Sequence, residues 1–411
     1  MACSNIDSET AVKQARAAVP KLVAYCLEND WSGYDPYDAL NSRLLQALPF
    51  LDFKLPRLIL TQAMKRSPVN IRRLALVPKT QNPKAIALFL SAFLNLARIG
   101  PKGDDDFVGR MLERLKALRS PGTPYWCWGY SFPWQTRTLI VPQGAPNLVC
   151  TAFVVNALLD LYEQRQWPES LEMAVSGAEY ILNELYWTDG GSRAGLAYPV
   201  PSMKFQVHNA NLLGAALFSR IHRLTGDTRF LGPALTVARY SAAAQREDGS
   251  WSYGEGTNQQ WIDNFHTGYN LCALRTMGEV LETAEFEPHV NLGFAFYRAF
   301  FFRDDGVARY YHNNTYPIDI HCVAQSIITL VRLRDLNAGN LAVARKVLGW
   351  AMEHMWDERG FFYYRVLRWG TIQTAYMRWS QAWMLMALST FLTVPAAGAF
   401  SSLPSESPAL A

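Results

Sequence analysis

Residues 263–271 read Asp-Asn-Phe-His-Thr-Gly-Tyr-Asn-Leu, a polar pair followed by a mainly apolar helical pattern. Openings of the same kind recur along the chain, and the steps between them are 65, 62, 55, 55 and 59 residues. A recurring unit of this length indicates a repeat architecture, because each unit needs its neighbours to bury its apolar face. The six openings are Asn82, Asn147, His208-Asn209, Asp263-Asn264, Asp319 and Arg378-Trp379.

More polar, amphipathic patterns lie between these openings, so each unit predicts one apolar helix, a turn and one amphipathic helix. Helices that are apolar on all sides belong in an interior, and amphipathic helices belong outside them. The sequence therefore predicts an all-α fold, an (α/α)6 toroid of six helical hairpins with inner and outer rings and few short strands in the loops. An open helical solenoid is the alternative, but its repeats are shorter. The amphipathic patterns span residues 9–28, 105–119, 168–186, 228–245, 287–303 and 340–356.

The chain of 411 residues is predicted to form one toroid domain over residues 1–395, in which residues 1–80 supply N-terminal outer helices. Residues 396–411 are rich in Ser and Pro, which predicts a flexible tail. Half of all residues are hydrophobic and 18% are charged, a composition that excludes a disordered protein. The net charge is only +4 and the basic residues are dispersed, so no nucleic-acid partner is expected.

The location of the protein is predicted from its N-terminus and its cysteines. The N-terminus has no basic and apolar signal segment, and the six cysteines form no C-x-x-C pair, so a cytoplasmic location is expected. The apolar stretch 383–400 is interrupted by Pro395 and Gly398, which favours a buried helix over a membrane span. No integral membrane span is expected.

In a toroid of hairpins the inner helices run parallel, so the polar residues at their N-termini gather at one end. Asp263, His266 and Asn270 have the spacing i, i+3, i+7 and share a helix face. Asp319 and His321 repeat the combination in the next unit. Asp263, His266, Asp319 and His321 are the candidate catalytic residues, because carboxylates and imidazoles serve as acids and bases. The alternative is that the aspartates are helix N-caps and the histidines are core residues.

Other polar side chains near the openings are candidate substrate-binding groups. Arg378 presents a planar fork of donors that fits a carboxylate, and a surface ion pair is its alternative role. A zinc ion held by three histidines, His208, His266 and His321, is a further alternative, but no H-x-x-x-H spacing supports it. No metal or other cofactor is expected. The polar candidates are Asn147, His208, Asn209, Asn211, Asn264, Tyr269, Gln325, Tyr376, Arg378 and Gln381.

Aromatic residues cluster in three segments, 125–134, 251–261 and 369–383. Tyr and Trp combine an apolar face with a polar tip, so they stack well on the flat faces of sugar rings. Loops anchored by their own aromatic residues are the alternative. The aromatic candidates for sugar binding are Trp126, Trp128, Tyr130, Trp134, Trp251, Tyr253 and Trp261.

With these features the sequence resembles the six-hairpin glycosidase-like superfamily over most of residues 80–395. The resemblance rests on the repeat length and on Leu-Thr-Gly-Asp-Thr-Arg-Phe at 224–230, Asp-Gly-Ser-Trp-Ser-Tyr at 248–253 and Trp-Ile-Asp-Asn-Phe-His at 261–266. More narrowly, the layout is similar to poorly characterised bacterial proteins associated with exopolysaccharide synthesis. The resemblance implies a funnel lined by aromatic residues with acids and bases at Asp263, His266, Asp319 and His321, and association with polysaccharide synthesis machinery.

The resemblance implies a carbohydrate-active enzyme acting on a bacterial polysaccharide or oligosaccharide. It is either a glycoside hydrolase using Asp263 and Asp319 or a uronate lyase or epimerase using His266 or His321. The chain departs from the usual glycosidase pattern, because no pair of Glu residues lies at the openings and Glu255 is the single Glu nearby. A non-catalytic polysaccharide-binding scaffold is the alternative. A terpenoid-cyclase-like toroid is less favoured, because its funnel would be apolar.

Overall fold

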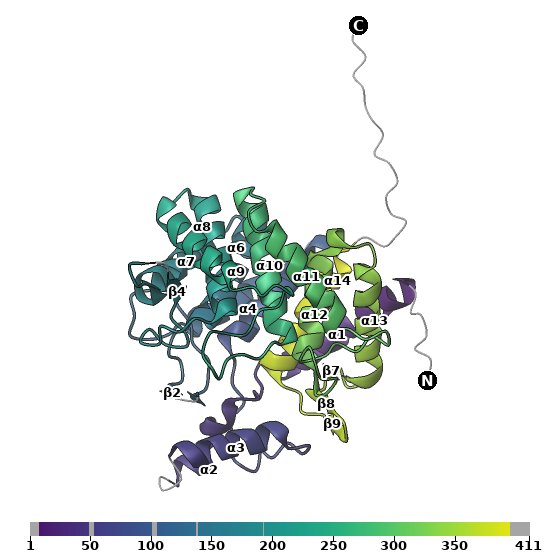
Figure 1. Ribbon diagram of the computed structural model, residues 1–411. Helices are drawn as coiled ribbons and strands as arrows, with labels where there is room; N and C mark the ends of the chain where they lie inside the picture. The colour runs from purple at the N-terminus through teal and green to yellow at the C-terminus, as the bar shows by residue number, and fades with distance from the viewer. Residues whose placement is uncertain (1–7, 49–52, 101–104, 137–138, 192, 395–411) are drawn as a thin grey trace.

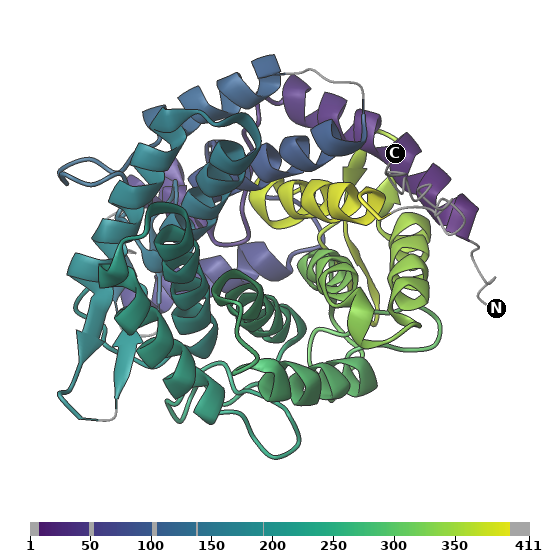
Figure 2. The ribbon, with the colours of Figure 1, turned by 90° about the horizontal axis from the view of Figure 1, so that it is seen from above.

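The computed structural model describes residues 8–48, 53–100, 105–136, 139–191 and 193–394. Its helices form two concentric rings, which Figure 2 shows from above. Each inner helix packs against the next, and the last, α14, packs against the first, α4, so the inner ring is closed. The inner helices are α4 (Pro83–Ile99), α6 (Leu148–Arg165), α8 (His208–Thr225), α10 (Asn264–Leu281), α12 (Ile320–Arg332) and α14 (Trp383–Leu392).

The residue ranges of the outer helices agree closely with those of the predicted amphipathic segments. Inner helices are buried on most of their surface, and in α12 every residue from Ile320 to Val331 is buried. Outer helices bury only one face, as α5 does with Val108, Met111, Leu112 and Leu115. This confirms the predicted (α/α)6 toroid. The outer helices are α1 (Ser8–Glu28), α5 (Asp105–Ala117), α7 (Pro168–Tyr180), α9 (Leu231–Ala243), α11 (Glu287–Phe300) and α13 (Asn340–His354).

Four inner helices begin where an Asn or Asp side chain accepts a backbone N–H of the first turn, as an N-cap does. Helix α8 instead starts after Val207, which has no side chain for capping. Helix α14 follows a π-helical turn, η6 (Met377–Ala382). The capping residues are Asn82, Asn147, Asp263 and Asp319.

Strands are few, short and confined to loops, as predicted. The one three-stranded sheet of the described residues has the order β5-β8-β9, and its β5–β8 register places Asp319 opposite Arg365. The strands are β1 (Trp134–Gln135), β2 (Ile140–Val141), β3 (Tyr186–Thr188), β4 (Ala194–Leu196), β5 (Ile318–Asp319), β6 (Trp356–Asp357), β7 (Phe361–Phe362), β8 (Arg365–Leu367) and β9 (Gly370–Ile372).

The N-terminal residues only partly follow the expectation of outer helices over 1–80. Helix α1 takes its place in the outer ring, whereas η1 (Asp38–Asn41), α2 (Arg43–Gln46) and α3 (Lys54–Arg66) project beyond one end of the toroid, together with β2, β8 and β9 (Figure 1). We call residues 34–80 the N-terminal excursion. The predicted tail at 396–411 lies outside the described residues. Over the described part of the chain, none of the helices has the length and apolar character needed to cross a membrane.

Candidate active site

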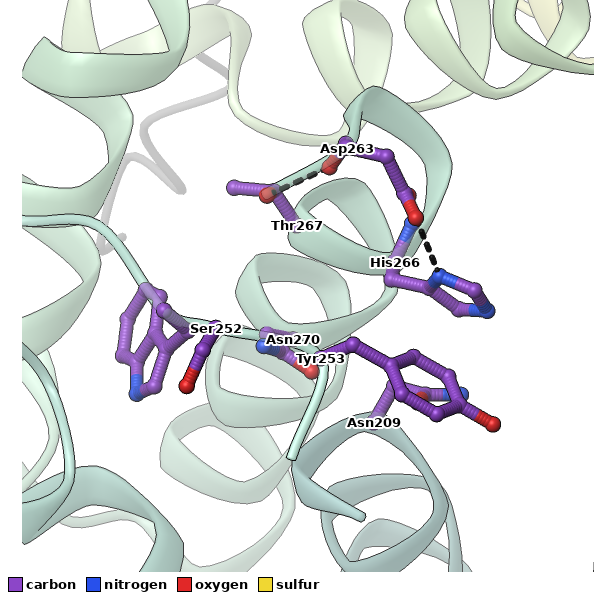
Figure 3. Close-up of a pocket in the computed structure, with 8 residues that line it drawn as sticks. Asn209, Ser252, Tyr253, Asp263, His266, Thr267 and Asn270 are labelled. Atoms are coloured by element: carbon purple, nitrogen blue, oxygen red, sulfur yellow. Dashed lines mark hydrogen bonds and ion pairs between the residues drawn. The ribbon is translucent and has the colours of Figure 1, made fainter. Parts of the chain in front are cut away.

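The candidate site lies at the end of the toroid where the inner helices begin. A narrow, nearly closed pocket lies there between α8, α10 and the loop before α10 (Figure 3). The side-chain oxygens of Asn209 and Asn270 are buried at this pocket and accept no hydrogen bond from the described residues. Each oxygen is thus an acceptor that lacks a donor among the described residues, and a hydroxyl group entering the pocket would supply one. The pocket is lined by Asn209, Trp251, Ser252, Tyr253, Asp263, His266, Thr267 and Asn270.

Asp263 performs two tasks with its two carboxylate oxygens. Its Oδ1 accepts the backbone N–H of His266 at 3.0 Å, which caps α10. Its Oδ2 lies 2.7 Å from Nδ1 of His266 and accepts Trp261 Nε1–H at 2.9 Å. Figure 3 shows Nδ1 turned to Asp263 and the opposite edge of the imidazole turned away. A carboxylate on Nδ1 favours the proton on that nitrogen and leaves Nε2 as the acceptor, which is the arrangement that a general base requires.

His321 lies deeper, and its Nε2 shares a hydrogen bond of 2.7 Å with the hydroxyl of Tyr269. The imidazole stacks on Trp383 and on Phe265, with ring centroids 4.4 and 4.5 Å away. Burial, together with the positive charges of nearby Lys84 and Arg378, holds the pKa of His321 well below its ordinary value. The ring is therefore neutral, and its surroundings disfavour the uptake of a second proton. Each of the two imidazoles, His266 and His321, lies 6.1 Å from the Tyr269 ring.

Asp319 is fully buried and all its hydrogen-bonding capacity is directed into the protein. Its Oδ1 accepts the backbone N–H of His321 at 2.9 Å and Trp379 Nε1–H at 2.8 Å. Its Oδ2 is paired with Arg365. Two N–H donors and the Arg365 guanidinium therefore occupy both oxygens of the Asp319 carboxylate, and neither oxygen is left for a ligand.

Lys84 belongs to the same neighbourhood, although the sequence analysis did not select it. It is the second residue of α4, it is only 3% exposed, and its Nζ lies 3.9 Å from the Phe153 ring and 5.2 Å from the Trp383 ring. Its side chain makes no salt bridge within the described part of the chain. Burial and the charge of Arg378 hold the pKa of Lys84 well below its ordinary value.

Arg378 is held inside the protein. Its Nε and Nη2 donate to the two carboxylate oxygens of Asp35 at 2.7 and 2.8 Å, and both side chains are 5% exposed. The guanidinium also lies 5.0 Å from the Tyr130 ring. The fork that the sequence suggested for a substrate carboxylate is thus occupied by Asp35, and this ion pair is buried, whereas the alternative role expected a surface pair.

Among the other predicted binding residues, the structure brings Asn209, Trp251 and Tyr253 to the pocket. Trp261 stacks on Tyr253 with ring centroids 4.5 Å apart. Together they form an aromatic wall beside the His266 imidazole, which lies 4.7 Å from the Tyr253 ring.

The remaining polar candidates make hydrogen bonds within the fold. Asn147 caps α6, Asn211 accepts the backbone N–H of Leu196, Asn264 accepts the Tyr297 hydroxyl, and Gln325 donates to Thr329. Gln381 pairs with both backbone groups of Phe362, His208 lies 3.4 Å from the Ser241 hydroxyl, and the buried Tyr376 ring lies 4.8 Å from the Arg72 guanidinium.

The aromatic loop over residues 125–134 is largely anchored by its own packing. Trp128 is fully buried and donates to the Leu115 carbonyl, and Trp126 packs beside it against Arg119. Trp134 packs edge-on against Tyr130 at 6.1 Å. In the described residues no group of three His, Cys, Asp or Glu side chains is placed to hold a metal ion, so His208, His266 and His321 are not brought together.

The residues missed from the sequence are those that reach the site through tertiary packing. Arg365 comes from β8, Trp379 from η6, and Asp35 from the N-terminal excursion. Lys84 carried a signal, because it stands two residues after the predicted opening at Asn82. A lysine at a buried helix start without a neighbouring acid is unusual enough to be a candidate.

No sequence-family model matches the chain, and no curated protein matches it in sequence. Solved structures do match. An unsaturated glucuronyl hydrolase variant with the saccharide dGlcA-Glc-Rha-Glc has a TM-score of 0.61 at 13% identity, covering 92% of this chain and 95% of that chain. The GH76 α-mannanase of Bacteroides thetaiotaomicron has a TM-score of 0.60 at 12% identity, with 76% and 86% covered.

Cellobiose 2-epimerase from Spirochaeta thermophila is similar too, with a TM-score of 0.57 at 14% identity, covering 76% of this chain and 85% of that chain. These proteins have the (α/α)6 fold of the six-hairpin glycosidase-like superfamily. The fold resemblance expected from the sequence is therefore confirmed, and at such identities the likeness concerns the fold alone.

Proposed function

We propose that the protein is a carbohydrate-active enzyme that transfers protons on an acidic sugar, as a uronate epimerase or lyase. The observation that carries the proposal is that the site holds two differently placed imidazoles, while both aspartates are saturated with N–H donors. Hydrolysis needs one carboxyl group that can donate a proton. Asp319 has both oxygens engaged inside the protein, so it is not placed to reach the oxygen of a leaving group.

In this proposal Nε2 of His266 removes the hydrogen from the carbon that bears the sugar's carboxylate, and Asp263 stabilises the imidazolium that forms. The electron pair moves into the carboxyl group. For epimerisation, the His321–Tyr269 pair returns a proton to the opposite face of that carbon. For elimination, the electron pair instead expels the oxygen substituent of the adjacent carbon, which takes its proton from the same pair.

Lys84 is the group that receives the substrate carboxylate in place of Arg378. An anion beside Lys84 favours its charged form and stabilises the negative charge that develops during proton removal. The comparisons support a carbohydrate-active enzyme, since the similar structures include a sugar epimerase and a glucuronyl hydrolase. A role in exopolysaccharide metabolism, association with the synthesis machinery and a cytoplasmic location belong to the same proposal.

The test is to incubate the purified protein in deuterium oxide with matched neutral and uronic-acid oligosaccharides. Three signals are followed together: deuterium at carbon, the ultraviolet absorbance of an unsaturated product, and new reducing ends. We expect deuterium incorporation or unsaturation with the uronic acids only, both abolished in His266→Asn and His321→Gln. Reducing ends without either signal would assign hydrolysis, and sugar binding with no signal would assign a binding protein.

A further inference from the structure

The N-terminal excursion exposes an unusual number of large apolar side chains. Fifteen such side chains are exposed over the described residues, and seven of them lie between residues 44 and 76. Leu74 is 80% exposed and Val69 is 67% exposed. Scattered single apolar residues need no explanation, but a concentration of this kind marks a surface that another body covers. The seven are Leu44, Phe53, Leu55, Ile59, Val69, Leu74 and Leu76.

The excursion does not use these side chains to stabilise itself. Its own small core consists of Ala39, Met64 and Val77, with a few half-buried neighbours. On α3 the inner positions Thr61 and Met64 are buried, whereas Leu55 and Ile59, four residues apart, share an exposed face. The excursion therefore buries fewer large apolar residues than it exposes.

The same segment holds the excess positive charge of the protein. The excursion, residues 34–80, contains eight basic and three acidic residues, whereas the rest of the chain contains 31 basic and 32 acidic residues. Three of the eight turn inward, among them Arg72, which pairs with Asp38, and Lys65, which donates to Tyr37. The exposed ones are Arg43, Lys54, Arg66, Arg73 and Lys79.

We infer that this basic-apolar surface, formed by the seven exposed apolar and five exposed basic residues named above, docks the protein on an anionic lipid surface. Apolar side chains among Lys and Arg are typical of segments that lie in the membrane interface, where the apolar groups enter the acyl boundary and the cations face anionic headgroups. The core of a protein interface is usually depleted of charged residues, whereas five exposed cations accompany the seven exposed apolar side chains of the excursion. The uneven charge therefore favours lipid over a protein partner.

Docking through this surface would set the orientation of the toroid. Helices α2 and α3 project from the end at which β8 and β9 also lie (Figure 1). The excursion is fixed to that end, because Asp35 pairs with Arg378 and the Tyr37 ring packs 5.5 Å from the ring of Trp379. The inner-helix N-termini, and with them the candidate site, would face the lipid. This inference does not depend on the proposed function.

The test measures partition of the full chain onto vesicles of phosphatidylcholine alone or mixed with phosphatidylglycerol. We expect binding only to the anionic vesicles, weakened by salt. The double substitution Leu55→Ser/Ile59→Ser and the double substitution Arg66→Glu/Arg73→Glu should each lower the partition at least tenfold. The matched control is Leu292→Ser/Phe300→Ser, because both side chains are 43% exposed on α11. Circular dichroism and light scattering verify folding and oligomeric state.

Absence of binding to anionic vesicles would overturn the inference, and so would equal losses in the control variant. A dimer in solution that Leu55→Ser/Ile59→Ser dissociates, without vesicle binding by either form, would assign the surface to a second copy of the chain. Binding that persists in neutral vesicles and high salt would contradict the role given to the basic residues.

Discussion

Asp35 and Arg378 are 343 positions apart in the chain, yet they form a bidentate ion pair with N–O distances of 2.7 and 2.8 Å. The pair joins the N-terminal excursion to the turn that begins the last inner helix. Trp379, the next residue in that turn, donates to Asp319 and packs beside His321. The ion pair therefore fixes both the N-terminal excursion and the turn whose Trp379 contacts Asp319 and His321.

Asp35→Ala should destabilise the protein by about 3–5 kcal/mol, because it leaves the Arg378 guanidinium buried and unpaired. The double substitution Asp35→Ala/Arg378→Met should recover most of that loss, since it removes both charges. Equilibrium denaturant unfolding measures both free energies. Glu9→Ala is the control, because the Glu9–Lys13 pair is exposed and its loss should cost under about 1 kcal/mol. Equal losses at Asp35 and Glu9 would contradict the buried-pair interpretation.

Asp263→Asn separates the capping role of Asp263 from its role toward His266. Asparagine is an equally good N-cap, so the cap is kept, and the loss of the Oδ2 contacts with His266 and Trp261 should lower the free energy of unfolding by about 1–3 kcal/mol. The amide no longer fixes the imidazole or stabilises its charged form, so kcat should fall about 10²- to 10⁴-fold. Asp227→Asn is the matched control, since Asp227 caps the start of η4 (Thr228–Phe230) away from the site. Unchanged kcat in Asp263→Asn would exclude His266 as the assisted base.

The sequence was sufficient to predict the two rings because their signal is local. Apolar helices with polar openings repeat at a regular step, and the structure starts inner helices directly after Asn82, Asn147, Asp263 and Asp319. The excursion was not predicted, because α3 is short and amphipathic, as an outer helix would be. Only the position of α3 in the folded protein distinguishes it from an outer helix.

The candidate site was predictable in part for the same reason. Asp263 and His266 lie in one helical turn, so their spacing alone predicts their contact. The partners of Asp319 and Arg378 come from β8 and from the excursion, and no local pattern links them. Whether a buried polar residue serves the substrate or the fold depends on such partners, and they are known only once the chain is folded.

Lys84→Met tests whether Lys84 recognises a substrate anion. Methionine has a similar length and no charge, so the variant should be at least as stable as the original, because it no longer buries an unpaired amine. Binding of uronic-acid oligosaccharides should weaken about 10- to 100-fold, as expected for a lost charge-assisted hydrogen bond, whereas matched neutral sugars should be unaffected. Calorimetric titration measures both.

The control for Lys84→Met is Lys13→Met, which alters an exposed lysine on α1. If Lys84→Met weakens acidic and neutral sugars equally, Lys84 contributes packing and not recognition. If neither affinity changes while turnover persists, the proposed proton transfer stands and the assigned role of Lys84 is wrong.

The stability of the protein should fall as the pH falls below about 6.5, because two buried histidines must stay neutral in the folded state. Burial lowers the pKa of His208 and of His321, so the unfolded chain takes up protons at a pH where the folded chain does not. Each group can contribute a slope of about 1.4 kcal/mol per pH unit. Asp38 opposes this trend, since burial raises its pKa to about 6 and the folded state then binds the proton first.

The histidine contribution is therefore isolated as the difference in free energy of unfolding between the original protein and His208→Gln or His321→Gln, each unfolded by denaturant between pH 5 and 8. That difference should shrink toward acid pH; a difference that is constant with pH would mean that neither histidine is held neutral by the fold.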